Sequence, residues 1–282
     1  MKAAFAVSLG LAILASLCAV SPAAAGDSDN AKAYLDVATQ LRGEAGLTED
    51  RELKKGLLMQ SGEAFLRSAD GLSSEQAQKA LLDAAATFRL AGGEDTLAKV
   101  ITVTFLIERR FQGTDAAAKA LVARGEVYAE QKEWGRAVAS WTKVHKEHPS
   151  SEAAPEALFK SGQIFADKIK NTDEATKAFG AVLKDYPKSD VADDALFAQA
   201  QLKEDAKQYA EAATDYLALS KRFPDSSLAD KAMFAAINIY DKSLKDYRKA
   251  HDQAVEFRKL YPHSEFLKKV ESIEQKTMKY VG

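Results

Sequence analysis

Four short segments decide the fold, because each contains a proline and recurs at a nearly constant interval. They read His148-Pro149-Ser150-Ser151, Tyr186-Pro187-Lys188-Ser189, Phe223-Pro224-Asp225-Ser226 and Tyr261-Pro262-His263-Ser264. The prolines lie 38, 37 and 38 residues apart, each with an aromatic or imidazole ring before it and a serine two places after it. Proline cannot continue a helix, and it disfavours helical geometry in the residue before it. The segments therefore predict joints between repeated structural units.

Two further columns of residues keep the same register between the joints. An alanine stands twelve residues before each proline, and four residues later comes an aromatic residue in the first three units and an alanine in the fourth. Positions i and i+4 share one face of a helix, so the alanine lets neighbouring helices approach and the ring fills the space beside it. Each unit is thus predicted to be a helix, a tight turn, a helix and a break. The columns are Ala137, Ala175, Ala212 and Ala250, followed by Trp141, Phe179, Tyr216 and Ala254.

A third pattern, alanine followed by leucine or methionine and then phenylalanine, recurs after the first three prolines. It reads Ala157-Leu158-Phe159, Ala195-Leu196-Phe197 and Ala232-Met233-Phe234. The pattern favours rings that belong to the core between helices. The alternative is that some of these rings form the floor of a binding surface.

These columns resemble the tetratricopeptide repeat family. The resemblance implies an all-α fold, an α-α superhelical solenoid of tetratricopeptide-like helix pairs. The proline spacing exceeds the period usual in that family, which is about 34 residues. Longer helices are therefore predicted, and Lys203 stands where the third unit should carry an aromatic residue. The first unit matches at Leu121, Gly125, Tyr128, Trp134, Ala137, Trp141 and Pro149, and the second at Leu158, Gly162, Phe165, Ala175, Phe179 and Pro187. The third matches at Leu196, Ala200, Tyr209, Ala212, Tyr216 and Pro224, and the fourth at Met233, Ile237, Tyr240, Tyr247, Ala250 and Pro262.

The register also divides the chain into segments. Residues 118–265 are predicted to hold four repeats, and residues 73–117 a degenerate fifth, because Ala77, Ala80 and Leu81 follow Gly71-Leu72-Ser73-Ser74 at the expected offsets. Residues 26–72 are predicted to be helical, with a turn over 42–50. Residues 266–282, rich in Lys and Glu, are predicted to form the polar-faced capping helix that such a stack needs.

Residues 1–25 have the features of a cleavable export signal. Lys2 is followed by an apolar run over 3–20, and Ala23 and Ala25 fit a signal-peptidase site before Gly26. A membrane anchor is the alternative, but the run is short for a span and ends at a proline. Leu17 disfavours lipidation of Cys18, the only cysteine of the chain. We therefore expect a periplasmic protein without disulfides and without an integral membrane span after cleavage.

The composition argues against nucleic-acid binding, and the motifs argue against catalysis. The net charge of −2 provides no overall basic field for nucleic acid. Phosphate loops, paired metal-binding cysteines and nucleophile elbows are missing from the sequence. His145 and His148 could share a metal, but we expect them to be exposed at a helix end; the carboxylate pairs Asp193-Asp194 and Glu204-Asp205 suit a solvated helix face. The sequence thus predicts a non-enzyme with no cofactor and no metal.

The resemblance further implies that the first helix of each repeat lines a concave surface. Carried over by position, that surface is mostly acidic or amide and would suit a basic or polar extended segment of a partner protein. The predicted partner-binding residues are Glu126, Glu130, Gln163, Asp167, Gln201, Asp205, Asn238 and Asp241.

The predicted function is a non-catalytic periplasmic scaffold that mediates protein–protein interactions in a bacterial cell-envelope complex and can associate peripherally with a membrane complex. Exported repeats with such joints are similar to the outer-membrane assembly lipoproteins and to the TolA-binding coordinator of cell division. Two alternatives remain: a helical accessory protein of peptidoglycan remodelling, and a chaperone-like binder of envelope clients.

Overall fold

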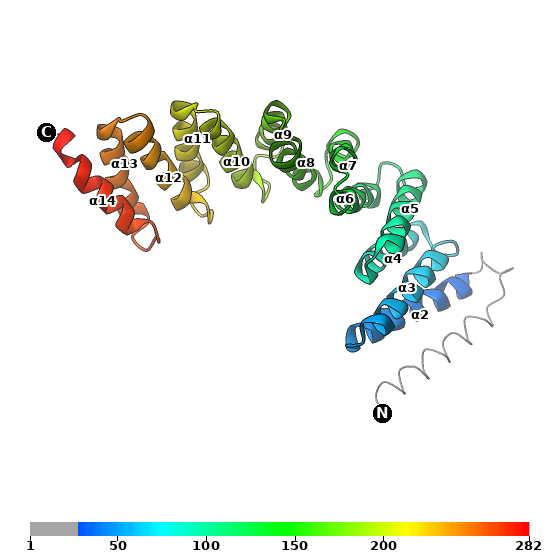
Figure 1. The fold of residues 1–282 in the computed structure, drawn as a ribbon. Coiled ribbons are helices and arrows are strands. Elements are labelled where there is room, and N and C mark those ends of the chain that lie inside the picture. Colours follow the sequence, from blue (N-terminus) through cyan, green and yellow to red (C-terminus); the bar gives the residue numbers. More distant parts are fainter. Residues whose placement is uncertain (1–27, 282) are drawn as a thin grey trace. The chain divides into compact units, whose positions relative to one another are not determined.

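A computed structural model describes residues 28–281, so the predicted export signal lies outside the described residues. Helices and the turns between them make up this part of the chain, and it contains no strand, which confirms the all-α prediction. The chain divides after Ala154 into two compact units. Each unit is a row of helices packed on their sequence neighbours (Figure 1).

The structure describes six helices in residues 28–147 of the first unit. They are α2 (Ser28–Leu47), α3 (Arg51–Ser68), α4 (Ser74–Ala91), α5 (Glu94–Arg110), α6 (Asp115–Glu130) and α7 (Trp134–Glu147). Asp50, Ser73 and Thr114 accept backbone N–H bonds at the starts of α3, α4 and α6, so side chains satisfy these helix ends. The turn predicted over 42–50 is shorter than expected, because α2 continues through both Gly43 and Gly46 to Leu47.

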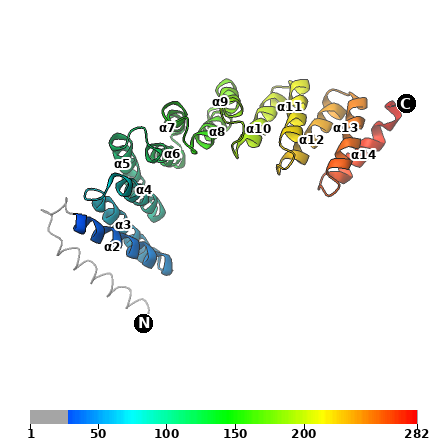
Figure 2. The same cartoon turned by 180° about the vertical axis from the view of Figure 1, so that it is seen from behind.

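The second unit holds the remaining described helices, and Figure 2 shows them from behind. They are α8 (Ala154–Ile164), η2 (Phe165–Ile169), α9 (Thr172–Asp185), α10 (Ala192–Asp205), α11 (Tyr209–Arg222), α12 (Ala229–Asn238), η3 (Ile239–Ser243), α13 (Tyr247–Leu260), α14 (Leu267–Thr277) and η4 (Met278–Tyr280). Among the described residues no helix is long and apolar enough to cross a membrane.

The four proline joints share one backbone geometry. In each, the serine N–H donates to the carbonyl of the ring residue three places earlier, as Ser226 does to Phe223 at 3.1 Å. The N–H three residues further on then donates to the serine carbonyl, as Ala229 does to Ser226 at 3.1 Å. Two successive turns therefore lead from one helix into the next. At three joints the serine hydroxyl also donates to an aspartate one repeat earlier: Ser151 to Asp115, Ser226 to Asp193 and Ser264 to Asp230.

The alternating repeat length has a local cause. The ring residues of successive joints, with Phe111 in the first place, lie 37, 38, 37 and 38 residues apart: Phe111, His148, Tyr186, Phe223 and Tyr261. Within the described chain, π-helical turns occur only in the two longer intervals, as η2 and η3. A π-turn accommodates one more residue than an α-turn. Each longer interval therefore places its additional residue at the end of the first helix.

After each of these first helices comes a lysine with a left-handed backbone, at Lys132, Lys170, Lys207 and Lys245 (φ 54–60°). At Lys207 two backbone bonds close the helix end: the lysine N–H donates to Glu204 at 2.9 Å and the Gln208 N–H donates to Lys203 at 2.8 Å. This is the pattern of a Schellman cap, in which glycine is preferred. A side chain in this conformation carries a steric cost of about 1–2 kcal/mol.

Replacing one of these lysines by glycine should therefore stabilise the protein. We expect Lys207→Gly to raise the free energy of unfolding by about 0.5–1 kcal/mol, because the relief of strain exceeds the entropy that glycine loses on folding. Urea denaturation measures the change. Lys207→Ala is the control, since it removes the same charge but keeps Cβ, and it should give no gain; equal gains from both variants would contradict the explanation.

The core depends on a small residue on one helix facing a ring on the next. A Cβ added at Gly125 would lie 2.6 Å from Trp141 Cδ1, and one added at Gly162 would lie 2.8 Å from Phe179 Cδ1. The ring of Trp141 is 3% exposed, and its Nε1 donates to the Val122 carbonyl at 3.2 Å. In these two repeats, the close approach of the helices thus also requires glycine on the helix that faces the ring.

A comparable contact occurs in the N-terminal segment, for which no register was predicted. Gly62 on α3 faces Phe88 on α4, and an added Cβ would lie 2.7 Å from Phe88 Cδ1. Ser61 Oγ donates to the Ala38 carbonyl at 2.6 Å and joins α3 to α2. The repeat-like packing of helices therefore begins before residue 73.

Candidate partner-binding face

The predicted partner-binding residues fall into three groups that differ in their contacts. In the second unit, Gln163 and Asp167 lie on α8 and η2, and Gln201 and Asp205 lie at the corresponding places on α10. All four side chains are exposed, and within residues 28–281 none makes a hydrogen bond or ion pair. Residues four apart lie on one face of a helix. We call these four side chains the open row.

The remaining two predicted residues of the second unit already have partners. The Asn238 Nδ2 donates to the Phe234 carbonyl at 3.0 Å within the same helix. Asp241 is only 5% exposed, and its Oδ1 accepts from Lys276 Nζ on α14 at 2.6 Å. The ion pair between Asp241 and Lys276 therefore joins α14 to the preceding helix pair, and Asp241 is buried.

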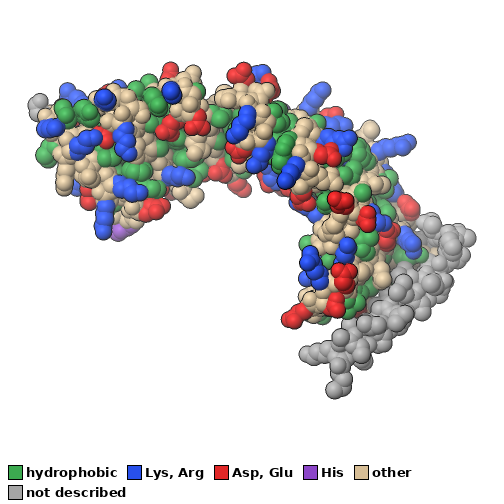
Figure 3. Space-filling model, viewed as in Figure 1, with side chains coloured by type: hydrophobic (Ala, Val, Ile, Leu, Met, Phe, Trp, Pro, Cys, Tyr) green, Lys and Arg blue, Asp and Glu red, His purple; other side chains and the backbone are tan. Residues whose placement is uncertain are grey.

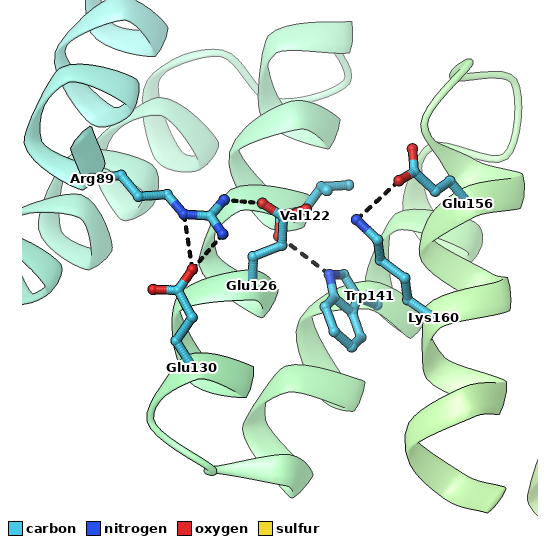
Figure 4. Close-up of polar contacts among 7 residues, drawn as sticks. All are labelled: Arg89, Val122, Glu126, Glu130, Trp141, Glu156 and Lys160. Carbon is cyan, nitrogen blue, oxygen red and sulfur yellow. Dashed lines mark hydrogen bonds and ion pairs between the residues drawn. The ribbon is translucent and has the colours of Figure 1, made fainter. Parts of the chain in front are cut away.

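In the first unit both residues of the predicted acidic pair form ion pairs with one arginine from another helix. The Arg89 guanidinium on α4 donates to Glu126 and to Glu130 on α6, with 3.0 Å between Arg89 Nε and Glu130 Oε1 (Figure 4). Burial lowers the pKa of Arg89, but the bonds and charges of Glu130 and Glu126 outweigh burial and raise it. The two carboxylates of this unit are thus held in an ion-pair network.

Both histidines are less exposed than predicted, and His145 is half-buried. His148 is not exposed but 8% accessible, because it occupies the ring position of its joint, where its backbone N–H donates to the Val144 carbonyl at 2.8 Å. Residues 28–281 contain no cluster of three or more His, Cys, Asp or Glu that could hold a metal ion.

One charged cluster was missed by sequence reasoning. Glu108 on α5 forms ion pairs with Arg124 on α6 and with Lys143 on α7, each at 2.5 Å, and the Arg124 side chain is 5% exposed. Burial raises the pKa of Glu108, but the hydrogen bonds and charges of Lys143 and Arg124 outweigh it, so the net shift is downward. The Arg124 guanidinium also lies 3.9 Å from the centre of the Phe105 ring. The cluster joins three helices, which makes its main role structural.

The recurring phenylalanines pack against core rings; Phe197 is buried, whereas Phe159 and Phe234 are half-buried. Phe159 contacts Phe179 at 5.6 Å between ring centroids, Phe197 contacts Tyr216 at 5.3 Å, and Phe234 stacks on Phe266 at 4.7 Å. The Tyr216 hydroxyl donates to Glu204 at 2.9 Å, and burial followed by this bond raises the tyrosine pKa far above its usual value. The carboxylate of Glu204 is thus used in packing. Lys203, where an aromatic was expected, pairs with Asp215 at 2.5 Å.

Comparison with solved structures places this fold among helical-repeat proteins. The chain is similar to PilF of Pseudomonas aeruginosa, with 14% identity, a TM-score of 0.50, and coverage of 86% of this chain and 97% of that one. It also matches YrrB, a tetratricopeptide repeat protein with a peptide-binding site, at 14% identity and a TM-score of 0.48, over 75% and 99% of the two chains. A tetratricopeptide repeat protein from Parabacteroides merdae matches at 15% identity and a TM-score of 0.46, over 86% and 99%.

One family model matches part of the sequence. No curated protein matches the chain, but three consecutive segments match the family model described as tetratricopeptide repeat: residues 119–151, 156–189 and 194–226. Each matched segment contains a pair of antiparallel helices, ends in a proline joint, and overlaps one of the first three repeats predicted from the columns. Within residues 119–226, the chain therefore matches three consecutive tetratricopeptide repeats.

Proposed function

We propose that this protein is a non-catalytic periplasmic adaptor, which holds partner proteins within a bacterial cell-envelope complex. The repeats support a role in protein binding. The basic start, the apolar run and the small-residue site within residues 1–25 support export.

The open row is the observation that carries the binding role. Of the eight predicted residues, these four are exposed and have no partner in the described chain, whereas Glu126, Glu130 and Asp241 are held by Arg89 and Lys276. An ion-paired carboxylate must give up its partner before it can bind another cation, but Asp167 and Asp205 need not. Partner binding is therefore assigned to the second unit.

The chemistry of the open row indicates the kind of partner. Two amides can each donate to and accept from a peptide backbone, and two carboxylates attract Lys or Arg side chains. The row repeats from α8 to α10, so it suits an extended segment that contacts successive repeats more than a single small ligand. The partner is proposed to present a basic or polar extended segment.

Crosslinking in intact bacteria tests the binding role. A photoreactive residue replaces Gln163 or Gln201, and the adducts are identified by mass spectrometry. We expect the same discrete envelope proteins from both positions, and their loss in Asp167→Lys/Asp205→Lys, because reversal repels a basic segment. The control position is Glu211, which is exposed on α11 outside the row. Equal adducts from Glu211, or unchanged adducts after charge reversal, would contradict the assignment.

Fractionation tests the location separately. A C-terminally tagged chain should appear in the periplasmic fraction with an N-terminus at Gly26. Recovery of the uncleaved chain in the cytoplasm would refute export and leave the binding role to be judged by its own experiment.

A further inference from the structure

The C-terminal end of the second unit carries cations that no carboxylate neutralises. Lys242, Lys245, Arg248 and Lys279 are exposed, and in residues 28–281 none of them forms an ion pair. The two acids within residues 241–249 are already occupied, because Asp241 pairs with Lys276 and Asp246 pairs with Lys249. Lys and Arg side chains gather over this end of the molecule in Figure 3.

These cations come from two segments that are in direct contact. The ring of Tyr247, at the start of α13, stacks on Tyr280 of η4 with 4.4 Å between centroids. Lys276 Nζ, one turn earlier on α14, lies 5.6 Å from the centre of the Tyr247 ring as well as bonding to Asp241. Residues 241–248 and 276–280 therefore form one surface, which we call the basic end.

Exposed apolar side chains lie within the same two segments. Met278 is 65% exposed, Tyr280 46% and Leu244 38%. Single exposed apolar residues are common on protein surfaces. Three of them beside unpaired cations, in two contacting segments, form a mixed apolar and basic surface.

We propose that the basic end binds the surface of an anionic lipid bilayer. Lys and Arg near an anionic surface are attracted to lipid headgroups, while methionine, leucine and the amphipathic tyrosine ring can enter the interface. A protein partner would need a matching packed pocket around these apolar chains. A bilayer adapts to projecting side chains without one, and this favours lipid over an acidic protein.

Such binding would keep one end of the protein at a membrane without a spanning helix. It requires neither the partner nor the location proposed above, because it depends on charge and exposure at the basic end alone. The open row on α8 and α10 involves other residues, so failure at one surface leaves the other testable.

Vesicle co-sedimentation tests the proposal. The chain beginning at Gly26 is used, because the apolar run over 3–20 would itself bind lipid. The hydrophobic clusters around Leu41, Phe88, Phe179 and Tyr216 lie within 34–273, so this chain retains them. We expect binding to vesicles of phosphatidylglycerol and phosphatidylcholine, at least tenfold weaker binding to phosphatidylcholine alone, and further weakening as salt rises.

Matched charge variants locate the surface. Each cation contributes about fivefold to binding, so Lys242→Glu/Lys245→Glu/Lys279→Glu should lower affinity by about 100-fold or more. The control, Lys170→Glu/Lys207→Glu/Lys221→Glu, changes the net charge equally on exposed lysines of the same unit, and should lower affinity less than tenfold. Met278→Ser should weaken binding at high salt, where the apolar contribution dominates.

Three results would overturn the proposal. They are the absence of binding to anionic vesicles, equal binding to both lipid compositions, and equal losses in the two triple variants. If anionic vesicles are not bound, an acidic protein becomes the favoured occupant of the basic end. Circular dichroism of each variant confirms that the helices remain folded before binding is compared.

Discussion

Gly125→Ala should lower the free energy of unfolding by about 1–2 kcal/mol, although alanine is ordinarily the better residue in a helix. The added Cβ would lie 2.6 Å from Trp141 Cδ1 and 2.8 Å from Cε2, so the indole must move. Its ring is buried and its Nε1 bonds to Val122. Overpacking of this kind costs about 1–3 kcal/mol or more, which exceeds the propensity gain of about 1 kcal/mol.

Denaturant unfolding checks this prediction against a matched glycine. Gly56 lies inside α3, and an added Cβ there would meet nothing within 4 Å. Gly56→Ala should therefore stabilise the protein by up to about 1 kcal/mol. Trp141→Leu should reduce the cost of Gly125→Ala in the double variant, since the clash is removed. Losses that simply add would exclude the glycine–indole contact as the cause.

The second large effect is expected at Glu108. Glu108→Ala should destabilise the protein by about 3–5 kcal/mol, because it leaves the Arg124 charge buried without its carboxylate partner. Thermal and urea denaturation measure the loss. Glu63→Ala is the control: it removes the partner of Lys99, but both side chains of that pair are at least 38% exposed, so the loss should be below about 1 kcal/mol. Glu108→Leu/Arg124→Met should recover much of the stability, and failure to do so would argue against an unpaired charge as the cause.

The same residue predicts an acid dependence. The pKa of Glu108 is lowered in the folded protein, so its ionised form favours folding. This contribution is fully present above the unfolded value of about 4.3 and is lost as pH falls through the folded pKa. The free energy of unfolding should therefore fall below about pH 4 more steeply in the unaltered protein than in Glu108→Gln. Identical slopes for both proteins would contradict the assigned pKa shift.

The helix pairs could be predicted because their packing follows one period. Ala137, Trp141 and Pro149 recur at fixed offsets, and each has a local physical requirement that the sequence displays. The degenerate repeat is harder to recognise, since Val100 and Thr104 take the places of alanine and the ring on α5. Further upstream, the contact between Gly62 and Phe88 joins helices outside the predicted register. The turn predicted over 42–50 was too long, because Gly43 and Gly46 are exposed glycines that are tolerated within α2.

The sequence predicted which helices carry the residues of the candidate face, but not which of these residues already have ion-pair partners. Register places Glu126 and Asp167 on first helices, but it does not reveal that Arg89, 37 residues before Glu126, pairs with that carboxylate. Asp241 has the same difficulty, because Lys276 belongs to the capping helix and follows no repeat column. Such ion pairs depend on side-chain reach between helices, which a pattern of single positions does not contain.

The π-turns have a consequence for how the chain arose. Because the longer and shorter intervals alternate, ring residues two joints apart are always separated by the same stretch of chain, as at 111, 186 and 261 and at 148 and 223. Copying of single repeats, one at a time, would propagate one length. Alternation is the pattern expected if a two-repeat segment was duplicated, with η2 and η3 as copies of one insertion.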